Sequence, residues 1–153
     1  MNDSPPAPVI AVASELAEIE AVVDAAYRPY VARMGQTPGP MRDDYAAHVA
    51  AGRLRILRDA HGVAGLLVLI PEGTHMLLDN VAVAPRAQGR GYGRLLLDCA
   101  EAEARQQGFA AIRLYTHVSM VENVAIYTKR GYAETHRAEE NGLRRIYMEK
   151  PLP

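Results

Sequence analysis

The chain has 153 residues, of which 49% are hydrophobic and 23% charged, and its formal net charge is −1. This length fits one domain with a sizeable core, and the balance of residues is that of a folded globular protein rather than a disordered one. The near-zero charge argues against a general affinity for nucleic acid.

Residues 1–8 contain three prolines and predict a flexible N-terminal tail, which places the folded domain at 9–153. A faint strand is expected at 8–13. The chain has no basic segment followed by a short apolar one at its start and no run approaching about 18 apolar residues. We therefore expect a cytoplasmic protein without membrane contact.

Two helices are predicted in the first third of the chain. Residues 13–27 carry apolar side chains at helical spacing after Ser14, a candidate N-cap. Residues 29–40 contain three prolines and two glycines and predict a loop, after which 41–51 resume a helical pattern.

Alternating or apolar stretches predict strands at 54–58, 63–70, 75–84, 111–116, 132–138 and 143–150. The turns at 59–62 and 139–142 favour two hairpins. The second turn contains Asn-Gly, a pair that tolerates the positive φ of tight hairpins. Helical patterns fill 94–107 and 121–130. This order predicts an α/β fold with mixed strand pairing.

Cysteine and histidine usage predicts neither disulfides nor a metal site. The single Cys99 lies among apolar positions of the helix 94–107, which favours core packing. The five histidines show no ligand spacing with carboxylates or with Cys99, so no metal is expected.

The junction between the strand 75–84 and the helix 94–107 is the sequence Gln88-Gly89-Arg90-Gly91-Tyr92-Gly93. Glycines let the backbone adopt positive φ and approach a ligand closely, and the first N–H groups of a helix attract an anion. Arg86, Arg90 and Arg94 add positive charge. The junction therefore predicts a phosphate site.

The spacing of the glycines narrows the range of possible ligands. A dinucleotide loop requires a third glycine where Arg94 stands, and a P-loop requires Gly-Lys-Ser/Thr, which is absent. A tight turn without a ligand and a nucleotide-binding domain of another kind stay open as alternatives.

The segment Val81-Ala82-Val83-Ala84-Pro85, followed by residues 86–96, resembles the central motif of the GNAT superfamily of acetyl-CoA-dependent N-acetyltransferases. Residues 123–132 resemble the later motif of that family, in which a tyrosine is followed by three residues, a glycine and an aromatic residue. The resemblance covers nearly the whole chain. It implies a single α/β domain with a GNAT-type mixed central sheet flanked by helices.

The resemblance also implies acetyl-CoA as co-substrate. The pantetheine arm would pair with the backbone near Val81 and Val83, and the thioester would enter a slot between strands that splay around positions 83 and 116. A backbone N–H near Val81 would stabilise the oxyanion. The expected cofactor-binding residues are Val81, Ala82, Val83, Gln88, Gly89, Arg90, Gly91, Tyr92, Gly93, Arg94 and Asn123.

Tyr127 takes the position of the tyrosine usually proposed as general acid in that family. A phenol with a pKa near 10 stays protonated at neutral pH and can protonate a departing thiolate. A packing role with its hydroxyl in a hydrogen bond is the alternative. Met120 stands where many members have asparagine, and Asn123 is expected either to reach CoA or to cap its helix.

The attacking amine must lose a proton, and no base is obvious. The candidates are Asp79, His75, Glu72 and His117. Asp79 comes first because it shares strand parity with Val81 and Val83. Its alternative role is to cap a helix or to pair with an arginine, and the histidines are alternatively ordinary surface or core residues.

The acceptor is expected to bind near 29–45 and the final hairpin. Candidate pocket residues are Tyr27, Tyr30 and Tyr45, and candidate acidic attractants are Glu134, Glu139 and Glu140. Helix packing and a solvated hairpin are the respective alternatives.

These features predict an acetyl-CoA-dependent N-acetyltransferase in which a small-molecule or peptide amine attacks the thioester directly. The alternative is a non-catalytic acyl-CoA sensor or regulatory module, suggested by Met120 and the absence of an obvious base. The C-terminal strands, as exposed edges, suggest a possible homodimer.

Overall fold

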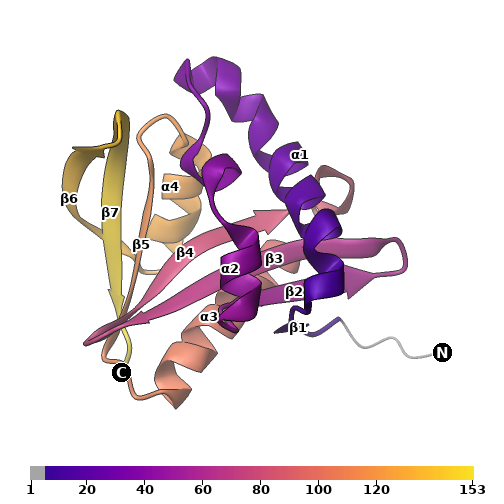
Figure 1. Cartoon of the computed structure of the whole chain (residues 1–153). Helices are drawn as coiled ribbons and strands as arrows, with labels where there is room; N and C mark the ends of the chain where they lie inside the picture. Colours follow the sequence, from indigo (N-terminus) through magenta and orange to yellow (C-terminus); the bar gives the residue numbers. More distant parts are fainter. Residues whose placement is uncertain (1–5) are drawn as a thin grey trace.

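The computed structural model describes residues 6–153, which form one mixed sheet with helices on both faces (Figure 1). The strand order is β1-β2-β3-β4-β5-β7-β6. Only β4 and β5 pair in parallel among these residues. The strands are β1 (Val9–Ile10), β2 (Leu54–Asp59), β3 (Gly62–Glu72), β4 (His75–Val83), β5 (Ala111–His117), β6 (Ala133–Glu140) and β7 (Leu143–Pro151). The α/β prediction is confirmed.

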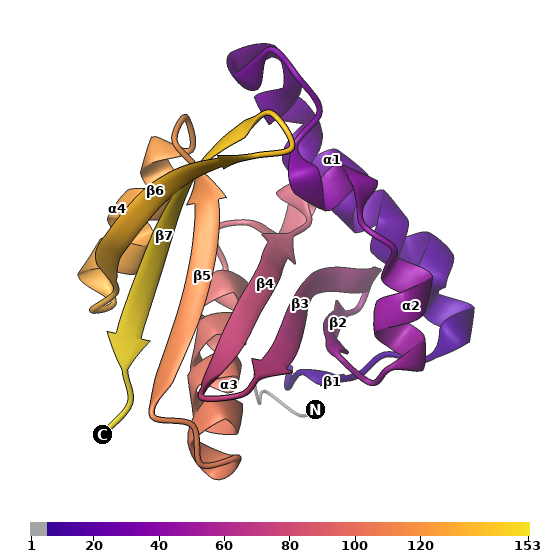
Figure 2. The same ribbon diagram turned by 60° about the vertical axis from the view of Figure 1, so that its left-hand side comes forward.

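The helices α1 (Leu16–Met34) and α2 (Tyr45–Ala50) cover one face, and α3 (Tyr92–Gln106) and α4 (Val121–Lys129) cover the other (Figures 1 and 2). Strand alternation explains the two cores, because successive side chains point to opposite faces. Leu66 packs with α1 residues such as Ile19, whereas Leu67 packs with α3 residues such as Leu96. None of the helices described is long and apolar enough to span a membrane.

The first helix is longer than predicted. α1 continues through Pro29 to Met34, so the loop predicted at 29–40 begins only at Gly35. A proline in a helix loses one hydrogen bond, but Tyr30 and Met34 still pack against the same buried cluster as Tyr27, which favours continuing the helix. Gly35, at φ 69°, then ends it by donating its N–H to the Val31 carbonyl at 2.9 Å.

The start of that helix also differs from the expectation. A 3₁₀ turn at Ala13–Glu15 precedes it, and Glu15 Oε1 accepts the N–H of Val12 at 2.8 Å. Glu15, not Ser14, therefore satisfies the first free N–H group. The tail prediction for residues 1–8 falls partly on 1–5, which lie outside the described residues.

β4 and β5 pair at only one end. Their register runs from His75 opposite Ala111 to Leu78 opposite Leu114 and stops there, while β5 stays paired with β7 as far as His117. The strands therefore diverge toward the end of β4 (Figure 2). The predicted splay is present.

The β6–β7 hairpin turns at Asn141 and Gly142, with φ of 53° and 78°, as the Asn-Gly pair predicted. Its tip approaches the end of α1 (Figure 2), where the Gln36 side-chain amide donates to the Gly142 carbonyl at 3.0 Å. This contact joins the segment after α1 to the hairpin above the divergent strands.

Candidate active site

The open edge of β4 offers backbone groups to a ligand. Ala84 donates its N–H to the Ala64 carbonyl of β3 at 2.7 Å. Because ladder bonds alternate along an antiparallel strand, the polar groups of Val81 and Val83 face away from β3. Their carbonyls accept side-chain bonds instead, from the Tyr27 hydroxyl at 3.1 Å and the Gln88 amide at 3.3 Å.

The glycine junction has the geometry of an anion cradle. Gly89 and Gly91 both have φ of 83°, and Gly91 is the N-cap of the 15-residue helix α3. A Cβ at either glycine would meet no atom within 4 Å, so backbone conformation rather than space requires glycine there. Within residues 6–153, the N–H groups of Gly89, Arg90 and Gly91 find no acceptor. They can therefore bind a phosphate.

Arg86 does not contribute charge to this cradle. Its guanidinium bonds Asp59 at 2.7 Å and the Val63 carbonyl at 3.1 Å, and the bond to Arg86 lowers the pKa of Asp59. Arg94 instead lines the adjoining groove, where Lys129 adds a cation that sequence analysis missed.

A groove of about 620 Å³ runs between the end of β4, the start of α3 and α4. This is the volume range of ligand sites. Of the predicted cofactor residues, the groove is lined by Val81, Ala82, Val83, Gln88, Gly93, Arg94 and Asn123. Gly89, Arg90, Gly91 and Tyr92 are not in its lining, and the Tyr92 side chain packs against both cores. Their candidate contribution is through the backbone.

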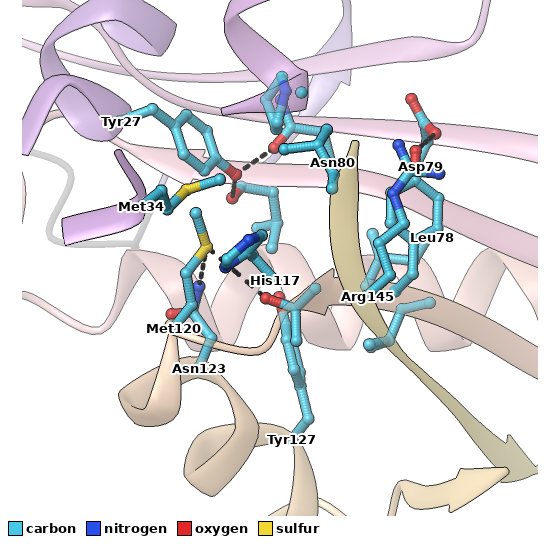
Figure 3. Close-up of a pocket in the computed structure, with 17 residues that line it drawn as sticks. Tyr27, Met34, Leu78, Asp79, Asn80, His117, Met120, Asn123, Tyr127 and Arg145 are labelled. Carbon is cyan, nitrogen blue, oxygen red and sulfur yellow. Dashed lines mark hydrogen bonds between the residues drawn. The ribbon is translucent and has the colours of Figure 1, made fainter. Parts of the chain in front are cut away.

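An inner pocket of about 50 Å³ (Figure 3) shares lining residues both with this groove and with a second cavity of about 400 Å³, the rear cavity. The inner pocket shares Val81, Asn123 and Tyr127 with the groove. It shares other residues, among them Asp79 and Arg145, with the rear cavity. A molecule in the groove and another in the rear cavity would meet in the inner pocket.

Tyr127 is 9% exposed and lines both the groove and the inner pocket. Burial raises the pKa of its phenol to about 12, so it is protonated at neutral pH. Its hydroxyl makes no hydrogen bond within the described chain, which argues against the alternative of a satisfied packing tyrosine. The proton is available to a ligand.

Asn123 does not cap α4. The helix begins after Met120, without a side-chain cap, and the Asn123 amide contacts the Met120 sulfur at 3.6 Å (Figure 3). Met120 is 4% exposed and packs in the α1-side core. Asn123 thus keeps its carbonyl oxygen for a ligand in the groove.

Asp79 lies on the rear-cavity side of the inner pocket, with its side chain 12% exposed. The Tyr115 hydroxyl donates to it at 2.9 Å, and among the described residues its ion-pair partner is His48, so it neither caps a helix nor pairs with an arginine. Burial raises the pKa of its carboxyl, and the nearby Asp43 carboxylate raises it further. Such a carboxylate is a better proton acceptor than an exposed one.

His48 stands between two carboxylates that sequence analysis did not connect. Its Nε2 lies 2.8 Å from Asp43 Oδ2 and 3.8 Å from Asp79 Oδ2, and the ring is buried. The three groups come within 4.8 Å of one another. The prediction against metal ligands considered spacing along the chain, which cannot detect a cluster formed between α2 and β4.

The other candidate bases fit less well. His75 pairs with Glu72 at 3.2 Å and lines a different cavity. His117 does line the inner pocket, and burial lowers its pKa. However, its Nδ1 accepts the Ser119 N–H at 3.1 Å, which leaves the proton of the neutral ring on Nε2. That nitrogen can donate but not accept.

A series of hydrogen bonds connects α1, β4 and the start of α2 beside the inner pocket. Tyr27 donates to Asn80 Oδ1 at 2.5 Å, Asn80 donates to the Tyr45 hydroxyl at 3.0 Å, and Tyr45 donates to the Pro40 carbonyl at 2.5 Å. Asn80 is 5% exposed and was not predicted. Its buried amide needs such partners, and this series of hydrogen bonds fixes β4 against α1 and the segment before α2.

The residues predicted to bind the acceptor amine do not lie together in one space. Tyr27 lines the inner pocket and Tyr30 the groove, whereas Tyr45 lines neither of these nor the rear cavity. Glu134 bonds Arg137 at 2.5 Å, and Glu140 bonds Arg145 at 2.9 Å. Glu139 is exposed and lines none of these three spaces.

The candidate site thus combines an open strand edge, a glycine cradle and an unbonded tyrosine hydroxyl where the groove meets the inner pocket. The chain belongs to the acetyltransferase (GNAT) family, whose model matches residues 18–132.

Two curated relatives are similar in sequence to this chain over part of their own length. The IAA acetyltransferase of Azospirillum brasilense is 34% identical over 90 residues, which are 58% of this chain and 59% of that protein. The mouse (Mus musculus) N-alpha-acetyltransferase 80 is 29% identical over 126 residues, which are 76% of this chain and 34% of that protein. The chain thus spans between about a third and three fifths of these two relatives.

Solved structures share the fold. A GCN5-related N-acetyltransferase from Rhodopseudomonas palustris aligns with a TM-score of 0.79 and 22% identity over 99% of both chains. The paia N-acetyltransferase from Thermoplasma acidophilum, solved with coenzyme A, aligns with a TM-score of 0.79 and 15% identity over 97% of this chain and 99% of that one.

Proposed function

We propose that the protein transfers an acetyl group from acetyl-CoA to an amine by direct attack, without a metal ion. The observation that carries the proposal is the Tyr127 hydroxyl, which is unbonded where the groove meets the inner pocket. Asp79 stands at the opposite side of that pocket. An acid and a base thus flank the place where the two substrates would meet.

Each step has a candidate group. Asp79 takes a proton from the ammonium, the free amine attacks the thioester carbonyl carbon, and a backbone N–H near Val81 stabilises the oxyanion. The C–S bond then breaks as the nitrogen loses its second proton to water and Tyr127 gives its proton to the departing sulfur, after which exchange with solvent restores Tyr127 and Asp79. The open N–H groups of the glycine junction and Arg94 would hold the pyrophosphate, and Asn123 would contact the pantetheine arm.

The second candidate is a non-catalytic acyl-CoA sensor. Met120, buried where many family members carry asparagine, favours it. The two candidates differ in whether any amine is consumed.

Dimerisation through β6, a free sheet edge eight residues long, remains a separate proposal that light scattering would test.

The test is thiol release from acetyl-CoA with amino acids, polyamines, aminoglycosides, arylamines and peptides as acceptors. The enzyme should release thiol with one class, and Tyr127→Phe should lower kcat about a hundredfold while acetyl-CoA affinity stays within about twofold. Tyr132→Phe is the matched control, because this neighbouring tyrosine has a buried hydroxyl without a partner in the described chain.

Unchanged turnover in Tyr127→Phe would remove this tyrosine from the mechanism. Tight CoA binding without thiol release from any acceptor would favour the sensor.

A further inference from the structure

The rear cavity has two chemically different sides, and this deepens the proposed function by indicating the kind of acceptor. Asp79, Asp43 and His48 make one side acidic. Arg145 and Arg42 line the same cavity. A simple amine needs only the acidic side, so the two arginines require a separate explanation.

Arg145 is held in place and retains free donors. Its guanidinium carbon lies 4.2 Å above the Tyr115 ring, and its Nη1 bonds Glu140 at 2.9 Å. In the described chain, Nε and Nη2 donate to no group. The side chain is only 15% exposed, and it lines the inner pocket, the rear cavity and a further cavity over β5, β6 and β7. A guanidinium with free N–H groups in this geometry suits a carboxylate.

Tyr115 sets the spacing between the two charges. The same ring that stacks under Arg145 donates its hydroxyl to Asp79 at 2.9 Å. One tyrosine side chain therefore separates the cation from the carboxylate. An acceptor that carries both an amine and a carboxylate, with a hydrogen bond at each end, would bridge these two charges.

Arg42 adds a second cation at the exposed side. Its side chain is exposed, and it makes no hydrogen bond or ion pair with any described residue. It is therefore free to turn toward an anionic ligand.

The rear cavity has the volume of a small-molecule site and opens to solvent on one side. Its volume is about 400 Å³, and the bond from Gln36 to the Gly142 carbonyl joins the two segments that border it. A small molecule fits in this volume beside the joined segments.

We infer that the acceptor is a small amino acid, whose carboxylate binds Arg145 and Arg42 while its amine meets Asp79. The inference rests on the proposed function. It adds a specificity role for two arginines that take no part in the chemistry.

The experiment compares thiol release for the common amino acids and their amides, which share the amine but lack the carboxylate. The amides have α-amines with a pKa near 8, so more of each amide is unprotonated and the comparison works against the inference. We expect kcat/KM for the best amino acid to exceed that of its amide by about tenfold or more, because a charge-assisted bond to carboxylate is lost.

Arg145→Gln should lower kcat/KM for the amino acid about tenfold, mainly through KM, and leave the amide within about twofold. Arg42→Gln, at an exposed residue without partners, should have the same selective effect without risk to folding. The matched control is Arg144→Gln, which removes the same charge from an exposed neighbour on β7 that does not line the cavity.

Equal use of amino acid and amide would overturn the inference while leaving the acetyltransferase intact. Arginine variants that lower both substrates equally would also overturn it. Thiol release from no acceptor at all would instead count against the proposed function, and the inference would fall with it.

Discussion

Asp79 is the residue whose ionisation should set the pH dependence of the protein. Its carboxyl has a raised pKa because of burial and the nearby Asp43. The ionised form is the base, so activity should fall as the pH decreases through that raised pKa. For stability the sign is opposite: the contribution of this group is complete below its unfolded pKa and is lost as the pH rises through the folded one.

Asp79→Asn should therefore separate activity from stability. We expect kcat to fall about a hundredfold, the acidic limb of the pH profile to change, and the thermal midpoint at neutral pH to rise, because a buried charge is removed. Turnover over pH and thermal denaturation measure the two effects. Asp24→Asn, at an exposed pair with Arg28, is the control and should alter neither. Wild-type turnover in Asp79→Asn would assign the base elsewhere.

The places of residues in the site were predictable where a local register or motif determines them. Tyr127 was singled out by the resemblance of residues 123–132 to the later GNAT motif, and strand parity placed Asp79 on the same face of β4 as Val81. Asn80, His48 and Arg145 were missed, because their roles depend on partners distant in sequence. The bond from Asn80 to Tyr45, for example, spans 35 positions. No periodic pattern records such a contact.

At the scale of elements, two glycines of the junction differ in what requires them. Gly91 is required for its backbone conformation, and Gly93 for the space beside a ligand. Gly91 has φ of 83°, which an alanine adopts only at a cost of about 1 kcal/mol or more. Gly93 has no positive φ, and a Cβ there would meet only the Val83 Cγ2 atom, at 4.0 Å. Gly93 also lines the groove, so the added methyl group would occupy space next to a bound cofactor.

Two alanine variants should therefore give opposite results. Gly91→Ala should lower the thermal midpoint by about 2–4 °C. Gly93→Ala should keep or raise the midpoint, because alanine favours helix, yet weaken CoA binding about tenfold. Thermal denaturation and calorimetric titration with CoA distinguish these effects. CoA binding by Gly93→Ala as tight as wild type would show that the cofactor does not approach this position.

Element types were predictable because hydrophobic period and turn residues determine them locally, as in the Asn141-Gly142 hairpin. The end of α1 was not, since Pro29 predicts a break that packing of Tyr30 and Met34 overrides. The wedge between β4 and β5 was expected only from the family resemblance. Nothing in either strand alone shows where their pairing stops.

At the scale of the whole molecule, the groove joins elements far apart in the chain. Tyr30 of α1, Val83 of β4, Arg94 of α3 and Ile126 of α4 all line it. Ile126 is 51% exposed, and a cofactor bound in the groove would cover it. A ligand there would contact both helical layers and so bind only the folded chain.

Cofactor binding should consequently stabilise the entire domain. A ligand at a hundredfold excess over its Kd adds about 2.7 kcal/mol, which for a chain of this size raises the thermal midpoint by about 5–10 °C. CoA and acetyl-CoA should both give this shift, whereas ATP and NAD at equal concentration should not, because neither carries a pantetheine arm to pair with the open edge of β4. Thermal denaturation with each ligand measures it, and Gly93→Ala should need more CoA for the same shift. A midpoint raised by ATP or NAD but unmoved by CoA would mean that the glycine junction binds a nucleotide of another class and that the pairing assigned to Val81 and Val83 is wrong.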